Sequence, residues 1–463
     1  MGEMLQTDRC LIEPLYFQSQ PSEPIELGSV AVEFTHNGKI WEDVCRVRMQ
    51  FTPSDRLLFL AQGREKHPLL YLDLFLNQKW DGRLKLPDRL VTLDALFLRS
   101  SDDAAGIFIP RNSVATLTPS SKKIFAVTFH IFNFPEFFGI QDYSITVGEG
   151  SRPSFKRCGR IVLSAGGWNI TIAATEMTGE LCEALRGQGG FVITHMGKVE
   201  REDGSTFSGE KLEHLLRCLH YFLSFALGRR TGPSLPIGFD KAGTRIFEQW
   251  GLPFTAAGPW SGSLSWFDCH HAEVLSQVFP GFLALWKSDL WMNALTKALY
   301  WYLAANERGT GIGVDAGLIP AQAALEVLAW TYCVMDRKMI SERAFKPRGL
   351  STADKFRLLA SVLDIPLEIP TELPTLHAKR DKSWQDGMDA ITDIRNSLVH
   401  PQKEPQLHHD VYFEAWKLSL WYLDSIFLRL FGHNGKYASR LAQRWVGQVT
   451  DVPWANIDSS GGG

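Results

Sequence analysis

The sequence lacks any grouping of cysteines that would suggest a metal site or a disulfide framework. Its seven cysteines are scattered along 463 residues, their number is odd, and none of them stands in a Cys-x-x-Cys pair. A structural zinc site is therefore not expected, and neither is the disulfide scaffold of a small secreted domain. The pattern is typical of a reduced, cytoplasmic protein.

The chain also lacks an excess of basic residues and a long apolar run. Its 48 Lys and Arg against 51 Asp and Glu give a formal net charge of −3. This balance argues against a general nucleic-acid coat protein but leaves room for a local basic site. Residues 1–4 lack the basic-then-apolar order of a signal peptide. The most apolar helical stretch, 418–431, contains Asp424 and Arg429 and is too short to cross a bilayer, so we expect a soluble protein without membrane contact.

Length and residue pattern together predict a multidomain chain. With 45% apolar and 21% charged residues, the chain is globular and long enough for about two to four domains. We expect an α+β protein with three parts. These are a β-sandwich-like region over residues 1–205, a mixed α/β connecting segment over 206–280, and an all-α helical bundle over 281–463.

Alternating apolar residues separated by turn signals dominate the first part. Asn37-Gly38 stands between two such runs and predicts a hairpin with a type I′ turn, because both residues tolerate positive φ. Asp81-Gly82 and Gly166-Gly167 predict similar turns. A β module of this kind is more often a recognition domain than a catalyst, so we expect it to bind a phage-derived or regulatory ligand.

Several groups of residues resemble ligand sites when each is considered alone, but their spacing or context does not fit such a site. His214 and Cys218 share one face of a predicted helix, whereas His220 lies on another side. The glycine-rich run 309–316 follows a helix and not the strand that a dinucleotide-binding loop requires. Two further groups lack a second ligand pair at zinc-site spacing: Cys269-His270-His271 and His408-His409-Asp410. In the second group, Asp410 is expected to cap a helix. We therefore predict neither a metal nor an organic cofactor.

The later part of the chain has the apolar period of helices. This period predicts helices over 212–225, 290–306, 321–336, 355–363, 388–400, 409–431 and 437–445. Gly228 is a natural C-terminal cap for the first of these, and Ser351 is an N-cap for the helix near residue 355. Antiparallel packing of four or more of the later helices would form an up-and-down bundle.

The last turns of the predicted helix 388–400 combine a cation, a carboxamide and an imidazole: Arg395, Asn396 and His400. Arginine binds phosphate through a rigid bidentate fork, and histidine transfers protons near neutral pH. In an ideal helix Arg395 and His400 lie about 140° apart with about 7.5 Å of rise between them. They therefore flank a groove and do not share one stripe.

Arg395-Asn396-Ser397-Leu398-Val399-His400 resembles the R-N-x-x-x-H form of the R-x(4–6)-H signature of HEPN domains, the helical domains named for higher eukaryotes and prokaryotes nucleotide binding. An upstream apolar helix with the step Ala324-Leu325-Glu326 and a long downstream helix fit the same family. The resemblance covers about the last 180 residues. With an N-terminal β module, the architecture is similar to some prokaryotic abortive-infection proteins.

This resemblance implies a metal-independent endoribonuclease that acts as a homodimer on RNA, with the two subunits contributing to one cleft. His400 would be the general acid or base, and Arg395 would hold the scissile phosphate. Asn396 would orient the phosphate or fix the local backbone. Glu326 and Asp393 are candidates for positioning Arg395. The product would carry a 2′,3′-cyclic phosphate.

Three alternatives stay open. The HEPN fold could serve only as a non-catalytic adaptor for dimerisation or RNA binding. The motif could also be structural, with Asn396 and His400 closing the helix by hydrogen bonds while Arg395 pairs with Asp393 or Asp386. Finally, the chain could join a carbohydrate- or peptide-binding β domain to a purely structural helical bundle.

Overall fold

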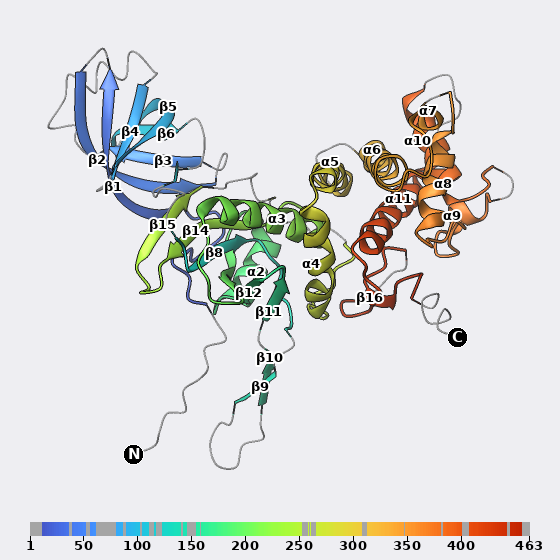
Figure 1. The fold of residues 1–463 in the computed structure, drawn as a ribbon, viewed down its shortest axis with the longest axis horizontal. Helices are drawn as coiled ribbons and strands as arrows, with labels where there is room; N and C mark the ends of the chain where they lie inside the picture. Colours follow the sequence, from blue (N-terminus) through green and yellow to red (C-terminus); the bar gives the residue numbers. More distant parts are fainter. Residues whose placement is uncertain are drawn as a thin grey trace.

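The structure of the chain is a computed structural model. It describes residues 12–455 except for 37–38, 52–55, 62–79, 87–88, 102–103, 111–114, 117–122, 140–141, 146–153, 158, 252–257, 259, 261–264, 308–312, 347, 381–382, 401–406 and 442–444. β-sheets form the N-terminal half and helices form the C-terminal part, as the sequence predicts. Figure 1 shows a small barrel at one end, a larger sheet in the middle and the helices at the other end.

The first β unit is a closed six-stranded barrel, where the sequence predicts a sandwich. Its strands are β1 (Ile25–His36), β2 (Lys39–Gln50), β3 (Arg56–Ala61), β4 (Trp80–Leu86), β5 (Arg89–Ser101) and β6 (Ala104–Pro110). They pair in the order β1-β2-β3-β6-β5-β4, and β4 pairs with β1 again. Closure leaves no unpaired strand edge, which is how small β domains avoid edge-to-edge association.

The second β unit is a seven-stranded sheet in the order β11-β12-β13-β8-β14-β15-β7. Its strands are β7 (Ala115–Thr116), β8 (Ala126–Phe132), β11 (Arg160–Ala165), β12 (Trp168–Ala174), β13 (Ile193–Arg201), β14 (Pro233–Phe239) and β15 (Arg245–Trp250), and a separate pair joins β9 (Asp142–Ile145) to β10 (Ser154–Arg157). β14 and β15 fall in the segment predicted to be a connector, so the sheet crosses the predicted boundary at residue 205.

The three predicted turns have different outcomes. Gly166-Gly167 joins β11 to β12 with φ values of 60° and 77°, which confirms a tight turn that needs positive φ at both positions. Asn37-Gly38 lies outside the described residues, although β1 and β2 pair up to His36 and Lys39. The prediction for Asp81-Gly82 is wrong, because both residues lie within β4, where the register shifts between Trp80 and Gly82. A bulge, like a turn, favours glycine.

Both faces of the seven-stranded sheet are buried. On one face Phe132, Ile193 and Leu235 pack against barrel residues such as Val47 and Phe59. The other face packs against α3 (Gly209–Leu227) and α4 (Glu273–Trp286), in the same core as the C-terminal helices. A further helix, α2 (Thr178–Gln188), precedes β13. α3 ends at Gly228 with φ 65°, which confirms the predicted cap.

The C-terminal part contains a set of packed helices. They are α5 (Asp289–Asn306), η1 (Val314–Gly317), α6 (Leu318–Ala329), the π-helical turn η2 (Trp330–Asp336), α7 (Glu342–Phe345), α8 (Thr352–Val362), α9 (Pro374–His377), α10 (Gly387–Val399) and α11 (His409–Leu430). The Ser351 side chain accepts a hydrogen bond from the Asp354 N–H, which confirms the predicted N-cap of α8. α6 packs on α5, α8, α10 and α11.

The predicted helix 437–445 is wrong. Lys436–Tyr437 forms the short strand β16, which pairs with β17 (Thr450–Asp451), and the described residues around them contain no helix. The Trp421 Nε1–H donates to the Tyr437 hydroxyl at 2.8 Å. The apolar spacing of this segment therefore reflects packing of an extended chain on α11.

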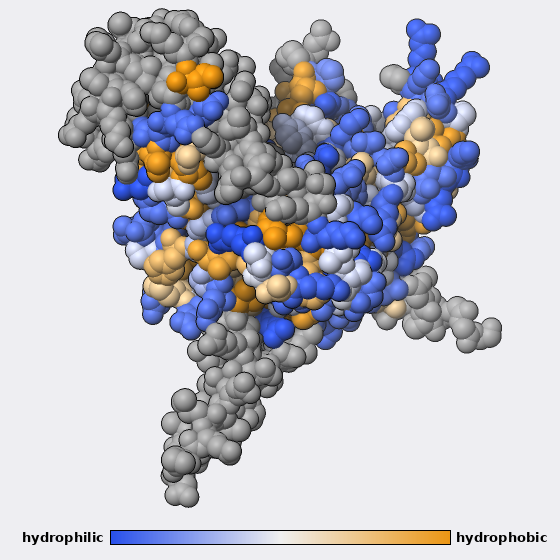
Figure 2. Space-filling model, turned by 60° about the vertical axis from the view of Figure 1, so that its left-hand side comes forward, coloured by the Kyte–Doolittle hydropathy of each residue, from blue (hydrophilic) through white to orange (hydrophobic). Residues whose placement is uncertain are grey.

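One continuous helical stretch, Val314–Asp336, has the length and composition of a membrane span. However, 56% of its most apolar window is buried inside the molecule, as in the core helix of a soluble protein. α11, which contains most of the predicted apolar stretch 418–431, is also buried from Leu418 to Leu428. On the face drawn in Figure 2, the described surface is mainly hydrophilic, with smaller hydrophobic patches between.

A buried ionic triad joins the C-terminal segment to two helices. Arg440 pairs through Nε with an Asp424 carboxylate oxygen, and both side chains are almost completely inaccessible to solvent. The Tyr302 hydroxyl donates to Asp424 Oδ1 at 2.7 Å and accepts from Arg440 Nη2 at 2.9 Å. Every member of the triad therefore depends on the other two for its hydrogen bonds.

Arg440→Met should destabilise the fold by about 3–5 kcal/mol, because it leaves Asp424 as an uncompensated buried charge. Urea unfolding measures this loss. Lys436→Met, which removes an exposed cation from the same segment, is the matched control and should cost less than about 0.5 kcal/mol. A loss of less than about 1 kcal/mol for Arg440→Met would contradict the structural role of the triad.

Among the described residues, His130, His195, His220 and His433 are buried, and burial lowers the pKa of each ring. The His130 Nε2 atom accepts from the Tyr16 N–H at 3.1 Å, so its Nδ1–H donates to the Leu235 carbonyl at 3.2 Å. Burial lowers the pKa of His130 to about 4, that of His195 to about 3 and that of His220 to about 4. The charged form of each ring is therefore disfavoured in the folded protein.

Mild acid should weaken the fold through these rings. The unfolded chain takes up protons near the ordinary histidine pKa of about 6.5, whereas folded His130 and His220 do so only near pH 4. Between these values the unfolded state binds more protons. Stability is therefore complete above about pH 6.5 and falls as the pH drops, by about 1.4 kcal/mol per pH unit for each ring. Urea unfolding between about pH 7 and 5 measures this slope.

His130→Gln is the informative variant for this slope. A glutamine amide can accept from Tyr16 and donate to Leu235 but does not titrate. The variant should therefore lose less stability than the wild type over the same pH range, and an unchanged slope would show that His130 does not contribute.

Candidate functional site

The predicted site residues lie at the C-terminal end of α10. The helix begins at Asp386, whose carboxylate accepts from the Asp389 N–H at 2.9 Å and from Arg357 Nε at 2.5 Å. It ends at His400, whose backbone N–H donates to the Asn396 carbonyl at 3.0 Å. Gly387 lies directly against Tyr422 of α11, where a Cβ atom would clash. This contact joins the start of α10 to the second half of α11.

The Arg395 guanidinium is half-buried and has no ion-pair partner among the residues that the structure describes. Its Nη1 donates to the Asn396 side-chain oxygen at 3.3 Å. Its Nε is buried without a hydrogen-bond partner, and no carboxylate pairs with it in the described part of the chain. An unpaired arginine that is partly withdrawn from water is unusual, because such a charge is normally compensated. Within the described part of the chain its charge is therefore uncompensated and can attract an anion.

His400 is exposed at the end of the helix. Its backbone is extended, with φ −115° and ψ 98°, so α10 ends at this residue. Among the described residues its ring makes no hydrogen bond. The imidazole is consequently available for proton transfer with a bound molecule.

The alternative in which Arg395 pairs with Asp393 or Asp386 does not match the contacts of these two carboxylates. Asp386 is occupied by Arg357 and the α10 N-terminus, and Asp393 accepts from Trp384 Nε1 at 3.1 Å. Glu326, the other candidate for positioning Arg395, is exposed on α6 and lines a hollow beside α5. Asn396 is the residue that contacts the guanidinium.

The α10–α11 hairpin brings further histidines to this end of the bundle. His408 and His409 are exposed at the start of α11. His408, and not Asp410 as predicted, is the N-cap, and its Nδ1 lies 3.0 Å from Asp410 Oδ2. Sequence spacing alone gave no reason to group them with Arg395, because residues 401–406 separate them from the motif.

No group of three metal-ligating side chains is present in the described ranges. Cys218 and His220 of α3 are buried in the core. The His271 ring contacts the Gly447 carbonyl through Nε2 at 3.1 Å, which is an ordinary packing contact between two segments.

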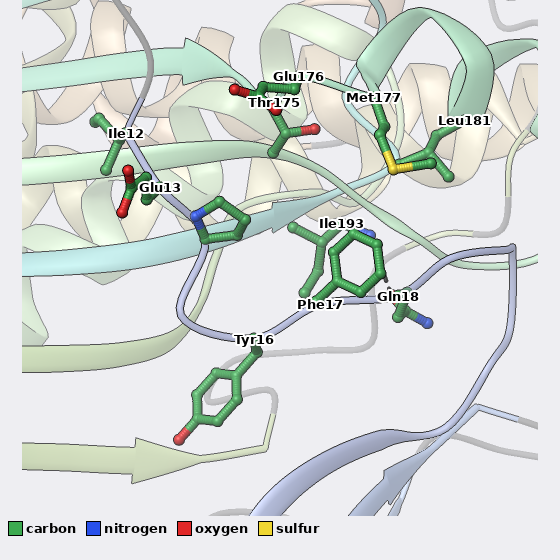
Figure 3. Close-up of a pocket in the computed structure, with 11 residues that line it drawn as sticks. Ile12, Glu13, Tyr16, Phe17, Gln18, Thr175, Glu176, Met177, Leu181 and Ile193 are labelled. Carbon is green, nitrogen blue, oxygen red and sulfur yellow. Dashed lines mark hydrogen bonds between the residues drawn. The ribbon is translucent and has the colours of Figure 1, made fainter. Parts of the chain in front are cut away.

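A separate pocket of about 310 Å³ lies in the β half, lined by the N-terminal segment, the start of α2 and Ile193. Figure 3 shows apolar side chains, including Phe17 and Met177, together with the carboxylates of Glu13 and Glu176. A ligand with an apolar body and a cationic group would match this lining.

Arg395→Met should change the free energy of unfolding by less than about 1 kcal/mol, because it leaves no buried charge unpaired. Asp386→Ala should cost about 1–3 kcal/mol, because it removes the α10 cap and the partner of Arg357. Urea unfolding of both variants makes the comparison. A loss for Arg395→Met as large as that for Asp386→Ala would indicate a structural role for Arg395.

Two family models match the chain, and they separate the sheet from the helices. Residues 119–262 match the YopA central domain, which here includes β8 to β15 and α3. Residues 288–451 match the YopA C-terminal domain, which here includes α5 to α11.

A relative from Bacillus subtilis (strain 168), the "SPbeta prophage-derived uncharacterized protein YopA", is 26% identical over 465 residues. That length covers 97% of this chain and 99% of the relative. No solved structure matches the chain. Neither the family descriptions nor the relative's name states an activity, so the ribonuclease chemistry stays a prediction. The chain is thus similar to a YopA protein over nearly its whole length.

Proposed function

We propose that this chain is a metal-independent endoribonuclease of the HEPN type. The observation that carries the proposal is the half-buried guanidinium of Arg395, which has no ion-pair partner among the described residues and stands five residues before the exposed imidazole of His400. A phosphodiester needs a fixed cation and a proton-transfer group, and these two side chains supply both. The packing of α5, α6, α10 and α11 supports a helical bundle of the HEPN kind around them.

In the proposed reaction the RNA supplies its own nucleophile, the 2′-hydroxyl. His400 accepts the proton of the 2′-hydroxyl, and the oxygen attacks the adjacent phosphorus. Arg395 binds the phosphate and stabilises the charge that develops on it. The bond to the 5′-oxygen breaks and that oxygen takes up a proton, which leaves a 2′,3′-cyclic phosphate and a 5′-hydroxyl. Asn396 positions Arg395 through the hydrogen bond between their side chains.

We further propose that two copies of the chain form the working unit. Arg395 and His400 of one copy lie on different sides of the end of α10. A cleft in which both kinds of group face the RNA from each side therefore requires a second copy. The resemblance to HEPN nucleases, which act as dimers, supports the same arrangement.

The β half is proposed to regulate the nuclease. The 310 Å³ pocket is where a phage-derived or regulatory ligand would bind, because it combines apolar and acidic groups in one concave site. The relative's prophage origin supports a phage-related role in the cytoplasm, such as abortive infection.

A non-catalytic HEPN adaptor is the second candidate. The hydrogen bond between the Arg395 and Asn396 side chains favours this adaptor, because it engages Asn396 within the chain. Such an adaptor would bind RNA through Arg395 without cleaving it.

Purified protein should cleave RNA in the presence of EDTA, and Arg395→Ala or His400→Ala should each reduce the rate by about 100-fold or more. Gel analysis of a labelled RNA measures the rate. His409→Ala, which removes an exposed histidine at the start of α11, is the matched control and should retain activity.

Two outcomes would reject the nuclease. Cleavage that survives both motif substitutions would place the chemistry elsewhere. RNA that is bound but stays intact with wild-type protein would favour the adaptor.

A further inference from the structure

The chain before the barrel lies against the central sheet without forming a helix or a strand. We call residues 12–24, which precede β1, the strap. The Ser22 N–H donates to the Phe191 carbonyl at 2.7 Å, and the Phe191 N–H donates to Ser22 Oγ at 3.2 Å. The Gln18 side chain accepts from the Ile193 N–H at 3.1 Å, and only 2% of Gln18 is exposed. The strap is therefore hydrogen-bonded to the segment that begins β13.

A buried tyrosine fixes the strap to two further strands. The Tyr16 hydroxyl donates to a Glu248 carboxylate oxygen of β15, and the Trp250 Nε1–H donates to the same oxygen at 2.9 Å. The Tyr16 N–H donates to His130 of β8. The tyrosine belongs to the apolar core that the barrel shares with the sheet. The strap is thus anchored at Tyr16 as well as at Gln18 and Ser22.

The strap forms one wall of the 310 Å³ pocket. Figure 3 shows Met177 and Leu181 extending from the start of α2 toward the strap, and Phe17 extending from the strap toward them. The other wall consists of residues at and just before the start of α2, together with Ile193. Because one wall is the strap, the pocket is complete only while the strap is docked on the sheet. The strap residues of the lining are Ile12, Glu13, Pro14, Tyr16, Phe17 and Gln18.

The apolar part of the lining is only partly covered by the protein itself. Phe17 is 57% exposed although it is a large aromatic residue. Met177 is half-buried and packs against Leu181 in a small core cluster. A ligand with an apolar body that lay on these side chains would remove them from water, which is favourable in proportion to the area covered.

The charged groups of the lining are acidic. Glu13 and Glu176 are exposed carboxylates, and among the described residues no lysine, arginine or histidine lines the pocket. Glu176 forms no ion pair within the described ranges. A cationic group is therefore attracted to the pocket and an anionic group is repelled. The volume of about 310 Å³ lies at the small end for ligand pockets, which fits a molecule with one ring or a short chain.

We propose that this pocket binds a small amine. Its apolar body lies against Phe17 and Met177, and its ammonium group pairs with Glu176. Because the amine contacts the strap, it binds the docked strap and shifts the strap toward that state. The inference rests on the proposed function only where the amine is called a regulator, since binding itself does not require RNA cleavage.

Binding is tested on the full-length chain by calorimetry with 2-phenylethylamine and with hexylamine, and with the two corresponding alcohols as neutral analogues. At least one amine should bind about fivefold more tightly than its alcohol. Glu176→Gln should weaken binding of that amine by about fivefold, because the ion pair it removes is open to solvent. Phe17→Ala should weaken binding of the amine and of the alcohol alike, because it removes apolar contact.

Glu180→Gln and Leu15→Ala are the matched controls. Glu180 is an exposed acid in the first turn of α2 and Leu15 is an exposed residue of the strap, and neither lines the pocket. Both variants should bind the amine as the wild type does. The proposal is overturned if neither amine binds at millimolar concentration, if each amine binds no more tightly than its alcohol, or if Glu176→Gln leaves the affinity unchanged.

Hydrogen exchange tests the coupling between the amine and the strap. The N–H groups of Tyr16 and Ser22 are hydrogen-bonded to the sheet side of the molecule, so their exchange requires the strap to open. Amine at about 100 times its Kd should slow this exchange by up to about 100-fold. Unchanged exchange in the presence of bound amine would contradict the coupling.

The site and the nuclease can fail separately. Amine binding by a protein that does not cleave RNA would reject the nuclease and leave the amine site standing. RNA cleavage by a protein that binds neither amine would reject the amine site alone.

Discussion

The packing of α11 against the surrounding helices is the constraint on which the C-terminal half depends. α11 contacts α10 through Tyr422 and Gly387, and its Glu414 carboxylate accepts from the N–H groups of Thr375 and Leu376 at the start of α9. Asp424 on the same helix binds Arg440. Because α11 is fixed from several sides, α10 is fixed as well. The end of α10 holds Arg395, for which the described residues offer no carboxylate partner.

The β half is organised by a different constraint, which is that both faces of its central sheet are apolar. The barrel covers one face and the helices α3 and α4 cover the other. The sheet therefore packs against both the barrel and the helical part. A ligand that binds in the pocket beside Ile193, a residue of β13 in this sheet, would act close to that connection, which gives the proposed regulation a physical route.

Local signals in the sequence predicted much of the fold, because they depend on neighbouring residues. Ser351, Gly228 and Gly166-Gly167 mark caps and a turn where the backbone requires them. Closure of the barrel and the return of β14 to the sheet depend on pairing between distant strands, which local patterns do not encode. The turn predicted at Asp81-Gly82 is wrong for a related reason, because glycine suits a bulge as well as a turn. For the site, the sequence supplied Arg395, Asn396 and His400, but only the fold showed that Asp386 is already occupied by Arg357.

The central claim is that Arg395 and His400 cleave RNA by activating its own 2′-hydroxyl. The most direct measurement compares an RNA with the same RNA carrying a single 2′-deoxynucleotide at the cleavage position, in EDTA, with identification of the ends formed. The account predicts that the normal RNA yields a 2′,3′-cyclic phosphate and a 5′-hydroxyl, and that the substituted position is not cut. Cleavage at the 2′-deoxy position would contradict it, because the nucleophile would then come from elsewhere.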